Sequence, residues 1–139
     1  MLDLSSFEKA LAALGEAIEA TASPELKRLM TPAQYHTLRA GLVQSFEFTY
    51  ELSWKFIKRW LEANLGAVYV DGVSRRELFR IAAEHRLIDD VEQWVFFHKL
   101  RNLTSHTYDQ DTANEVCEGA VLFYRQAEGL LSVLASRND

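Results

Sequence analysis

Apolar residues recur every three or four positions along most of the chain, which is the spacing of amphipathic helices. The first such segment predicts a helix over about residues 6–21, opened by a capping box of Ser5 and Glu8. The stretch TASPE then interrupts the pattern, and Thr31, Pro32 and Gln34 repeat the start signal. From there the pattern runs to Leu65, where the following glycine ends a second, much longer helix.

The long helix is apolar on more than one side. One stripe holds Tyr35, Leu38, Leu42, Phe46, Thr49, Ser53, Phe56 and Trp60, and another holds Val43, Tyr50, Trp54, Ile57 and Leu61. A helix of this kind is either central in a bundle or shared with a second subunit. We expect both, and therefore a homodimer.

Three further helices follow the long helix. Ser74 and Glu77 form a capping box that opens a helix to about His85. The next helix is capped by Asp89 or Asp90 and leads into a polar segment, and the last covers about residues 112–135 after a cap by Asp109 or Asp111.

The fold predicted from these elements is an all-α up-and-down bundle of about five helices with a four-helix-bundle core. It forms a single domain over residues 1–139. The only strand-like fragment, AVYVDGVSRRE, is expected to be a connecting loop with a turn at Asp71-Gly72. The chain has only 2 Pro and 6 Gly, which agrees with long helices rather than with a β-protein rich in tight turns.

Composition narrows the class of protein. The hydrophobic fraction of 48% and charged fraction of 25% are typical of globular domains. The lone Cys117 excludes an internal disulfide and is expected to be a small buried hydrophobe. No apolar run approaches the roughly 18 residues of a membrane span, and the N-terminus lacks the basic start of a signal peptide. We therefore expect a cytoplasmic protein without membrane contact.

The net charge of −5 disfavours simple electrostatic adhesion to nucleic acid. The charges are unevenly distributed, however. Residues 55–101 carry nine Lys and Arg against seven Asp and Glu, whereas both flanking segments are acidic. The middle of the chain is thus the part that favours a phosphate-bearing partner.

The sequence contains no Gly-rich phosphate loop, nucleophile elbow, HExxH motif or Cys/His cluster with metal spacing. Glu47 and Glu51 lie one helical turn apart, but the Glu-x-x-His pairs that would complete a carboxylate metal site are missing. Glu51 also precedes Lys55 by four residues, so a surface ion pair is the favoured interpretation. We expect no metal and no cofactor.

The segment RNLTSHTYDQD, residues 101–111, gathers polar residues at the predicted end of a helix. A polar helix end held by side-chain hydrogen bonds accounts for such a composition. The alternative is catalytic: Arg101 can hold a phosphate through two hydrogen bonds, and His106 can move a proton near neutral pH. Together they would suffice to cleave a phosphodiester without metal. Because the two lie about 140° apart on an ideal helix, this requires the helix to end near residues 104–106.

The motif Arg101 to His106 resembles the Arg-x4-to-6-His signature of the HEPN superfamily, including the polar Asn102 after the Arg. With Tyr108 it matches the Arg-x4-His-x-Tyr form of HepT-type toxins. The segment FEFTYELSWKFIKRWLE, residues 46–62, is similar to the nucleotidyltransferase substrate-binding proteins of the same superfamily. Together with the helix order, the resemblance spans nearly the whole chain.

The resemblance implies a helical homodimer with two motifs facing each other across a cleft, encoded beside a minimal nucleotidyltransferase and assembled with it. In the toxin branch it implies a metal-independent ribonuclease. Arg101 would then stabilise charge on the phosphate, His106 would be the general acid and base, and Asn102 would orient them. Tyr108 would accept AMP from the partner, which silences the toxin.

These observations leave two main hypotheses and a plainer one. The chain is a ribonuclease toxin of a toxin-antitoxin pair, or a non-catalytic subunit that binds a nucleotide or substrate for its partner, or a structural dimer whose motif caps helices. Residues assigned to RNA or nucleotide binding are His98, Lys99, Arg75 and Arg76. For His98 a hydrogen-bonded interior position, and for the arginines a solvated helix face, remain open alternatives.

Overall fold

The computed structural model describes residues 1–139 and contains helices only. The α-helices are α1 (Ser5–Ala22), α2 (Pro24–Leu29), α3 (Pro32–Leu65), α4 (Arg75–Glu84), α5 (Val91–Leu103) and α6 (Gln110–Ser136), joined by the 3-10 helices η1 (Ala67–Tyr69) and η2 (Thr104–His106). The all-α class is confirmed, and the strand-like fragment forms a connecting segment that contains η1 and ends in the first turn of α4. No helix combines the length and the apolar character that crossing a membrane requires.

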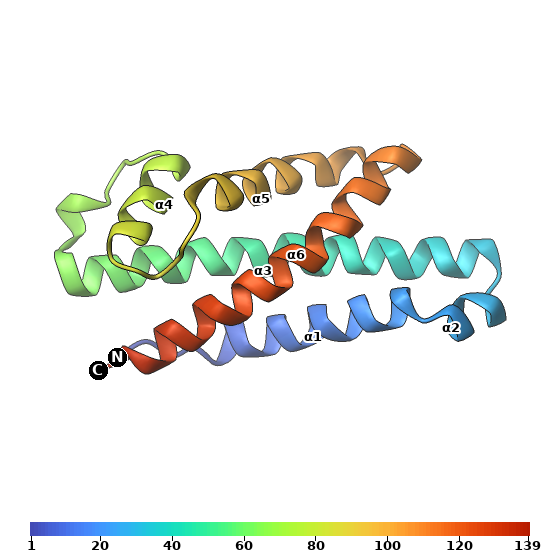
Figure 1. Cartoon of the computed structure of the whole chain (residues 1–139), viewed down its shortest axis with the longest axis horizontal. Coiled ribbons are helices and arrows are strands. Elements are labelled where there is room, and N and C mark those ends of the chain that lie inside the picture. The colour runs from blue at the N-terminus through green and yellow to red at the C-terminus, as the bar shows by residue number, and fades with distance from the viewer.

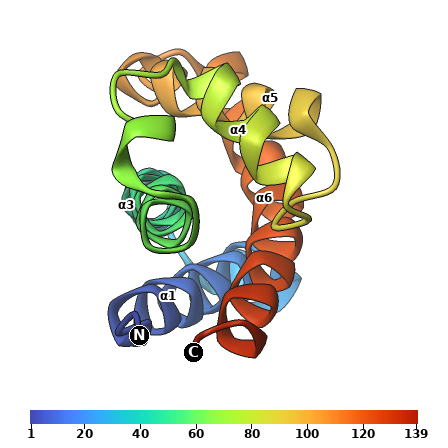
Figure 2. The ribbon, with the colours of Figure 1, turned by 90° about the vertical axis from the view of Figure 1, so that its left-hand side faces the viewer.

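Helices α1, α3, α5 and α6 form the core of the bundle, and α4 covers one end of it (Figure 1). Helix α1 packs against α3 and α6, and α5 packs against α3, α4 and α6. Viewed along the bundle, α6 slants from the layer of α5 down to α1 (Figure 2). The two chain ends meet, because the backbone N–H of Leu2 donates to Asn138 Oδ1 at 2.8 Å and Asn138 Nδ2 donates to the carbonyl of Leu2.

The long helix α3 supplies side chains to the core on two sides, as its two apolar stripes predict. On one side Phe56 stacks on Phe7 of α1, with ring centroids 5.7 Å apart. On the other, Tyr50 meets Phe123 of α6 edge to face with ring centroids 6.1 Å apart, and Phe46 of the first stripe meets the same ring at 5.2 Å. Phe123 also contacts the rings of Trp94 and Phe97 on α5, so one aromatic cluster joins three helices.

Most of the predicted helix starts are confirmed. The Thr31–Gln34 capping box is complete, with its two hydrogen bonds at 2.9 and 3.1 Å. The Ser74 side chain accepts from the backbone N–H of Glu77. Of the alternatives, Asp90 caps α5 and Asp109 caps α6.

One prediction at the N-terminal end is wrong, and one short helix is added to those predicted. The Ser5–Glu8 capping box does not form: Leu4 is the N-cap residue of α1, and the Asp3 carboxylate accepts from the backbone N–H of Ser5 at 3.0 Å. The chain has six α-helices where about five were predicted, because part of the interrupting segment belongs to the short helix α2. That helix is only six residues long and buries none of them, so it carries no periodic signal.

A substitution at Gly119 tests the close approach of α6 to α5. A Cβ built on Gly119 would lie 2.1 Å from Leu100 Cδ1, and Leu100 is fully buried. We expect Gly119→Ala to destabilise the fold by about 1–3 kcal/mol through overpacking. Gly129→Ala, on the same helix with nothing within 4 Å of the new Cβ, should instead stabilise it by about 0.5–1 kcal/mol. Urea unfolding of both variants measures this, and equal stabilities would contradict the proposed packing.

Candidate functional site

Arg101 lies in the last turn of α5 and faces α3. Its Nε donates to Glu51 Oε1 at 2.9 Å, and its Nη2 lies 3.2 Å from Glu47 Oε1. The two glutamates lie one turn apart on α3, so both carboxylates face α5 where the helices pack. Two carboxylates therefore hold one guanidinium in a defined orientation.

The guanidinium is not saturated by these contacts. Its Nη1 makes no hydrogen bond within the chain, and the side chain remains 32% exposed. Thr104 secures the neighbouring backbone, since its Oγ1 lies 2.7 Å from the carbonyl oxygen of Arg101 and 3.1 Å from Glu47 Oε2. Arg101 thus keeps donors for a ligand while its position is set by α3.

The expected pairing of Glu51 with Lys55 is wrong, because Glu51 pairs with Arg101 across the helix interface. The second oxygen of Glu51 accepts from Trp54 Nε1 at 3.0 Å. Glu47 and Glu51 are thereby occupied by protein donors, and no group of three or more His, Cys, Asp and Glu side chains is arranged to hold a metal ion.

Behind Arg101 lies a more buried polar pair, Tyr50 and His98. Tyr50 is fully buried, and its hydroxyl lies 2.9 Å from His98 Nδ1. Burial raises the pKa of Tyr50, which keeps the phenol protonated. Burial also lowers the pKa of His98, and the positive charges of Arg75 and Arg101 lower it further. Tyr50 therefore donates to a neutral imidazole, which is the interior role left open by the sequence.

Arg75 lies over an aromatic ring of α3. Its Cζ is 3.4 Å from the centroid of the Trp54 ring, a cation–π contact at the side of the same cluster. Arg75 Nε is buried without a hydrogen-bond partner. This placement brings Arg75, His98 and Arg101 together, although they come from two different helices.

The other half of the motif lies on the turn after α5. The helix ends at Leu103 and continues as η2, which confirms the expected end near residues 104–106. His106 is exposed, and its ring meets that of Tyr108 edge to face at 6.0 Å. Tyr108 is 86% exposed, and no hydrogen bond joins His106 to Arg101. The motif thus consists of a fixed arginine and a freely accessible His–Tyr pair.

The remaining predicted residues lie on the outside of the bundle. Asn102 and Lys99 are exposed on α5. Arg76 forms an exposed ion pair with Glu92. These three side chains do not join the cluster around Arg101.

Several residues of the cluster around Arg101 were not predicted from the sequence. Glu47 and Glu51 hold Arg101 although they lie 50 or more positions away in the chain. Thr104 donates a hydrogen bond to Glu47, and Trp54 donates one to Glu51. The available signal is that both glutamates fall on one face of a helix that is otherwise apolar on two sides. A polar strip of that kind has to meet polar groups on the helix packed against it.

Comparisons with known proteins agree with this fold. A family model described as nucleotidyltransferase substrate binding protein like matches residues 2–136. The chain belongs to this family. A solved Haemophilus influenzae structure, described as revealing the fold of a substrate binding domain of a nucleotidyltransferase, superposes with a TM-score of 0.91 at 30% identity over 96% of this chain and 99% of that one.

Two further relatives support membership of the nucleotidyltransferase substrate-binding family. A curated Haemophilus influenzae protein named probable ribonuclease HepT is 40% identical over 106 residues, which cover 74% of this chain and 71% of that protein. A crystal structure from Thermus thermophilus superposes with a TM-score of 0.75 at 28% identity, over 92% of this chain and 98% of that one. The resemblance identified from the sequence is confirmed at the level of the family.

The lowered pKa of His98 predicts that the folded chain becomes less stable in acid. Its pKa in the folded chain lies below the ordinary value of 6.5, so the unfolded chain takes up a proton at a higher pH than the folded chain does. The free energy of unfolding should therefore fall from about pH 7.5 to about pH 5. In His98→Gln, whose amide oxygen can accept from Tyr50, the fall should be smaller. Urea unfolding across this range measures both, and identical pH dependences would show that His98 does not contribute.

Proposed function

We propose that the protein is a metal-independent endoribonuclease and the toxin half of a toxin-antitoxin pair with a minimal nucleotidyltransferase. The observation that carries the proposal is the arrangement of Arg101 and His106. The arginine is oriented by Glu47 and Glu51 with Nη1 free, and the histidine is exposed a few residues further on. The name of the 40% identical relative, probable ribonuclease HepT, supports the same activity.

The chemistry assigned to the pair needs no bound metal. His106 takes the proton of an RNA 2′-hydroxyl as that oxygen attacks the adjacent phosphorus, or returns a proton to the 5′-oxygen that leaves. Arg101 donates from Nη1 to the phosphate oxygens, on which negative charge accumulates. Asn102, exposed on α5 directly after Arg101, is proposed to orient the two catalytic side chains.

The active form is proposed to be a homodimer in which two motifs share one cleft. Phe48 is 59% exposed in the middle of α3, and together with Leu52 it lies beside Glu47 and Glu51 in a shallow hollow. A second copy covering this apolar surface would bring its own Arg101 and His106 near the first pair. Lys99, Arg75 and Arg76 would then supply positive charge toward RNA in a chain that is acidic as a whole.

The ribonuclease proposal predicts that His106→Asn loses cleavage of bulk RNA by at least about 100-fold, since a general acid and base is removed. Because His106 is exposed, the fold should tolerate the change. Asp111→Asn, a neutral substitution at an exposed position nearby, should cleave at the wild-type rate. The assay uses protein purified without partner, in a chelator. Cleavage by His106→Asn at the wild-type rate would refute the proposal.

The partner is proposed to act on Tyr108, whose exposed phenol is open to another protein. Its oxygen would attack the α-phosphorus of ATP, forming a tyrosyl–AMP bond and releasing pyrophosphate and the phenolic proton. Co-expression with the neighbouring nucleotidyltransferase should raise the intact mass by one adenylyl group. Tyr108→Phe should abolish the increase, whereas Tyr69→Phe, another exposed tyrosine, should retain it. An unmodified wild-type chain, or modification of Tyr108→Phe, would contradict this assignment.

A second candidate is a non-catalytic subunit that binds a nucleotide or substrate for the nucleotidyltransferase. The observation that favours it is the charge balance around Arg101, where Glu47 and Glu51 already offset the guanidinium within one chain. The family description supports it as well. The ribonuclease assay separates the two candidates, because this one requires that RNA stays intact while a nucleotide is bound.

A further inference from the structure

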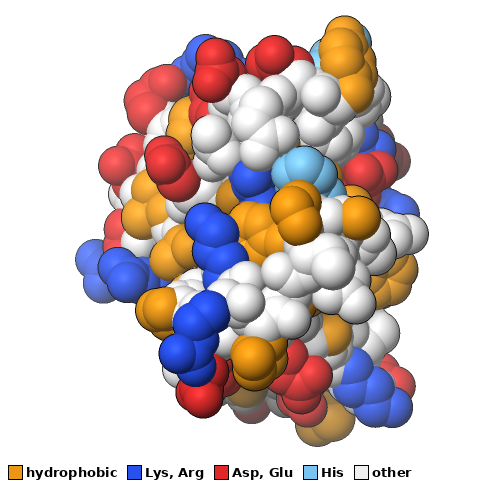
Figure 3. Space-filling model, turned by 90° about the vertical axis from the view of Figure 1, so that its right-hand side faces the viewer, with side chains coloured by type: hydrophobic (Ala, Val, Ile, Leu, Met, Phe, Trp, Pro, Cys, Tyr) orange, Lys and Arg blue, Asp and Glu red, His pale blue; other side chains and the backbone are white.

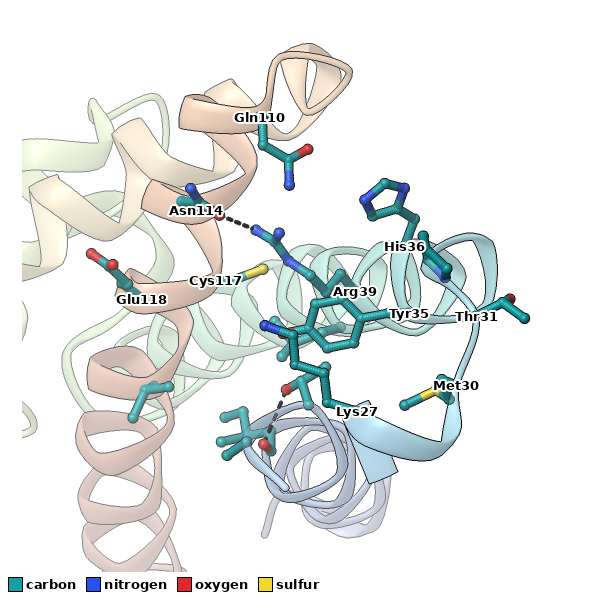
Figure 4. A pocket seen from close by; sticks show the side chains of 16 residues that line it. Lys27, Met30, Thr31, Tyr35, His36, Arg39, Gln110, Asn114, Cys117 and Glu118 are labelled. Carbon is teal, nitrogen blue, oxygen red and sulfur yellow. Dashed lines mark hydrogen bonds between the residues drawn. The ribbon is translucent and has the colours of Figure 1, made fainter. Parts of the chain in front are cut away.

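A pocket of about 650 Å³ opens at the end of the bundle where α2 and the start of α3 face the start of α6 (Figure 4). Part of its wall is apolar, with Ile18, Leu42 and Val121. No residue of the Arg101 cluster lines it. The pocket is therefore a separate site, of a size that small-molecule ligands occupy in other proteins.

Two cations are arranged around one aromatic ring in this pocket. Lys27 Nζ lies 4.9 Å from the centroid of the Tyr35 ring, and Arg39 Cζ lies 5.9 Å from it. Arg39 is further held by Asn114, whose Oδ1 accepts from Nη2 at 2.6 Å. The ring and the amide limit where these two side chains point, and Figure 4 shows both reaching into the space between α3 and α6.

The positive charge of the pocket is only partly offset within the chain. The five ion pairs of the structure involve neither Lys27 nor Arg39. His36 lies beside them, and Glu118 is the one carboxylate among the lining residues. Figure 3 shows this end of the molecule, where lysine, arginine and histidine side chains border hydrophobic surface. In a chain of net charge −5, such a concave and unpaired cationic site favours an anion.

The pocket adjoins the hollow that contains Tyr108. That hollow has a volume of about 310 Å³ and shares His36, Arg39 and Gln110 with the larger pocket, while Thr107 and Tyr108 line its other side. A ligand held by Arg39 therefore lies close to the turn that carries the motif.

We infer that this pocket binds a nucleotide, a ligand that joins a phosphate group to a planar ring. Lys27 and Arg39 hold the phosphate, for which a guanidinium offers paired donors. The ring lies against the apolar wall, and the amides of Asn114 and Gln110 hydrogen-bond its polar edge. The inference rests on the charge and shape of the pocket and is independent of the ribonuclease proposal; it gives the second candidate function a binding site.

Calorimetry with AMP, adenosine and inorganic phosphate, all without metal, tests the ligand class. AMP should bind more tightly than either of its parts, because only AMP uses both the cations and the apolar wall. Absence of AMP binding up to about 1 mM would overturn the inference. Adenosine or inorganic phosphate binding as tightly as AMP would overturn it as well, because the phosphate or the ring would then contribute nothing.

Two neighbouring basic residues of α2 provide a matched pair of variants. Lys27 lines the pocket, whereas Arg28 does not. Lys27→Gln and Arg39→Gln should each weaken AMP binding about tenfold or more, the loss expected for a charged hydrogen bond. Arg28→Gln removes the same charge and should bind AMP like the wild type. Equal weakening by all three variants would show only an effect of net charge and would overturn the site.

The reactivity of Cys117 tests whether the ligand binds in this pocket. It was expected in the core but is half-buried, and it lines the pocket with its sulfur directed toward Arg39 (Figure 4). Because it is the only cysteine, alkylation with iodoacetamide followed by intact mass reports on this pocket alone. AMP should slow the alkylation of the wild type and have little effect on Arg39→Gln. AMP binding that leaves the alkylation rate of the wild type unchanged would place the nucleotide elsewhere and overturn the inference. Calorimetry and alkylation do not involve RNA, so their outcomes are separate from that of the cleavage assay.

Discussion

Burial of the long helix α3 on two sides is the constraint that the remaining helices satisfy. The ring of Phe56 requires a partner on one side and receives Phe7 of α1. On the other side, the ring of Tyr50 packs against Phe123 of α6. Each of these rings, left in water, would forgo on the order of 1.5–3 kcal/mol of burial. Helices α1 and α6 are therefore held against neighbouring faces of α3 and against each other, and the short loops between neighbouring helices leave little freedom in how they are connected.

The candidate site is a consequence of that packing. Since α5 lies against the same part of α3, the end of α5 brings Arg101 over Glu47 and Glu51. The three side chains are each about a third exposed, so pairs of this kind add at most about 1 kcal/mol apiece to stability. Their main effect is orientation: the carboxylates restrict a long, mobile side chain to one position and leave part of its donor set unused. A residue that serves a phosphate benefits more from this preorganisation than the fold does.

The turn after α5 links two chemically different regions. On one side lies the Arg101 cluster, in which two carboxylates balance the cations. On the other lies the pocket of Lys27 and Arg39, where neither cation forms an ion pair and Glu118 is the one carboxylate in the lining. Tyr108 extends from this turn into solvent and borders the hollow next to the pocket. A group attached to Tyr108 or a ligand bound by Arg39 would therefore act close to the motif, which gives the proposed partner and the proposed nucleotide a common place on the molecule.

The sequence by itself determined the helices that are long, periodic or capped by side-chain oxygens, because periodicity and caps such as Thr31, Asp90 and Asp109 are local properties. It also indicated the family, through the motif from Arg101 to Tyr108 together with the segment 46–62 and the helix order. The tertiary structure alone decided the partners of those residues. Glu51 forms its ion pair with Arg101 and not with Lys55, and Lys27, Arg39 and Asn114 line one pocket. Contacts such as Arg101–Glu51 and Arg39–Asn114 join residues tens of positions apart in the sequence, so they depend on how the helices pack.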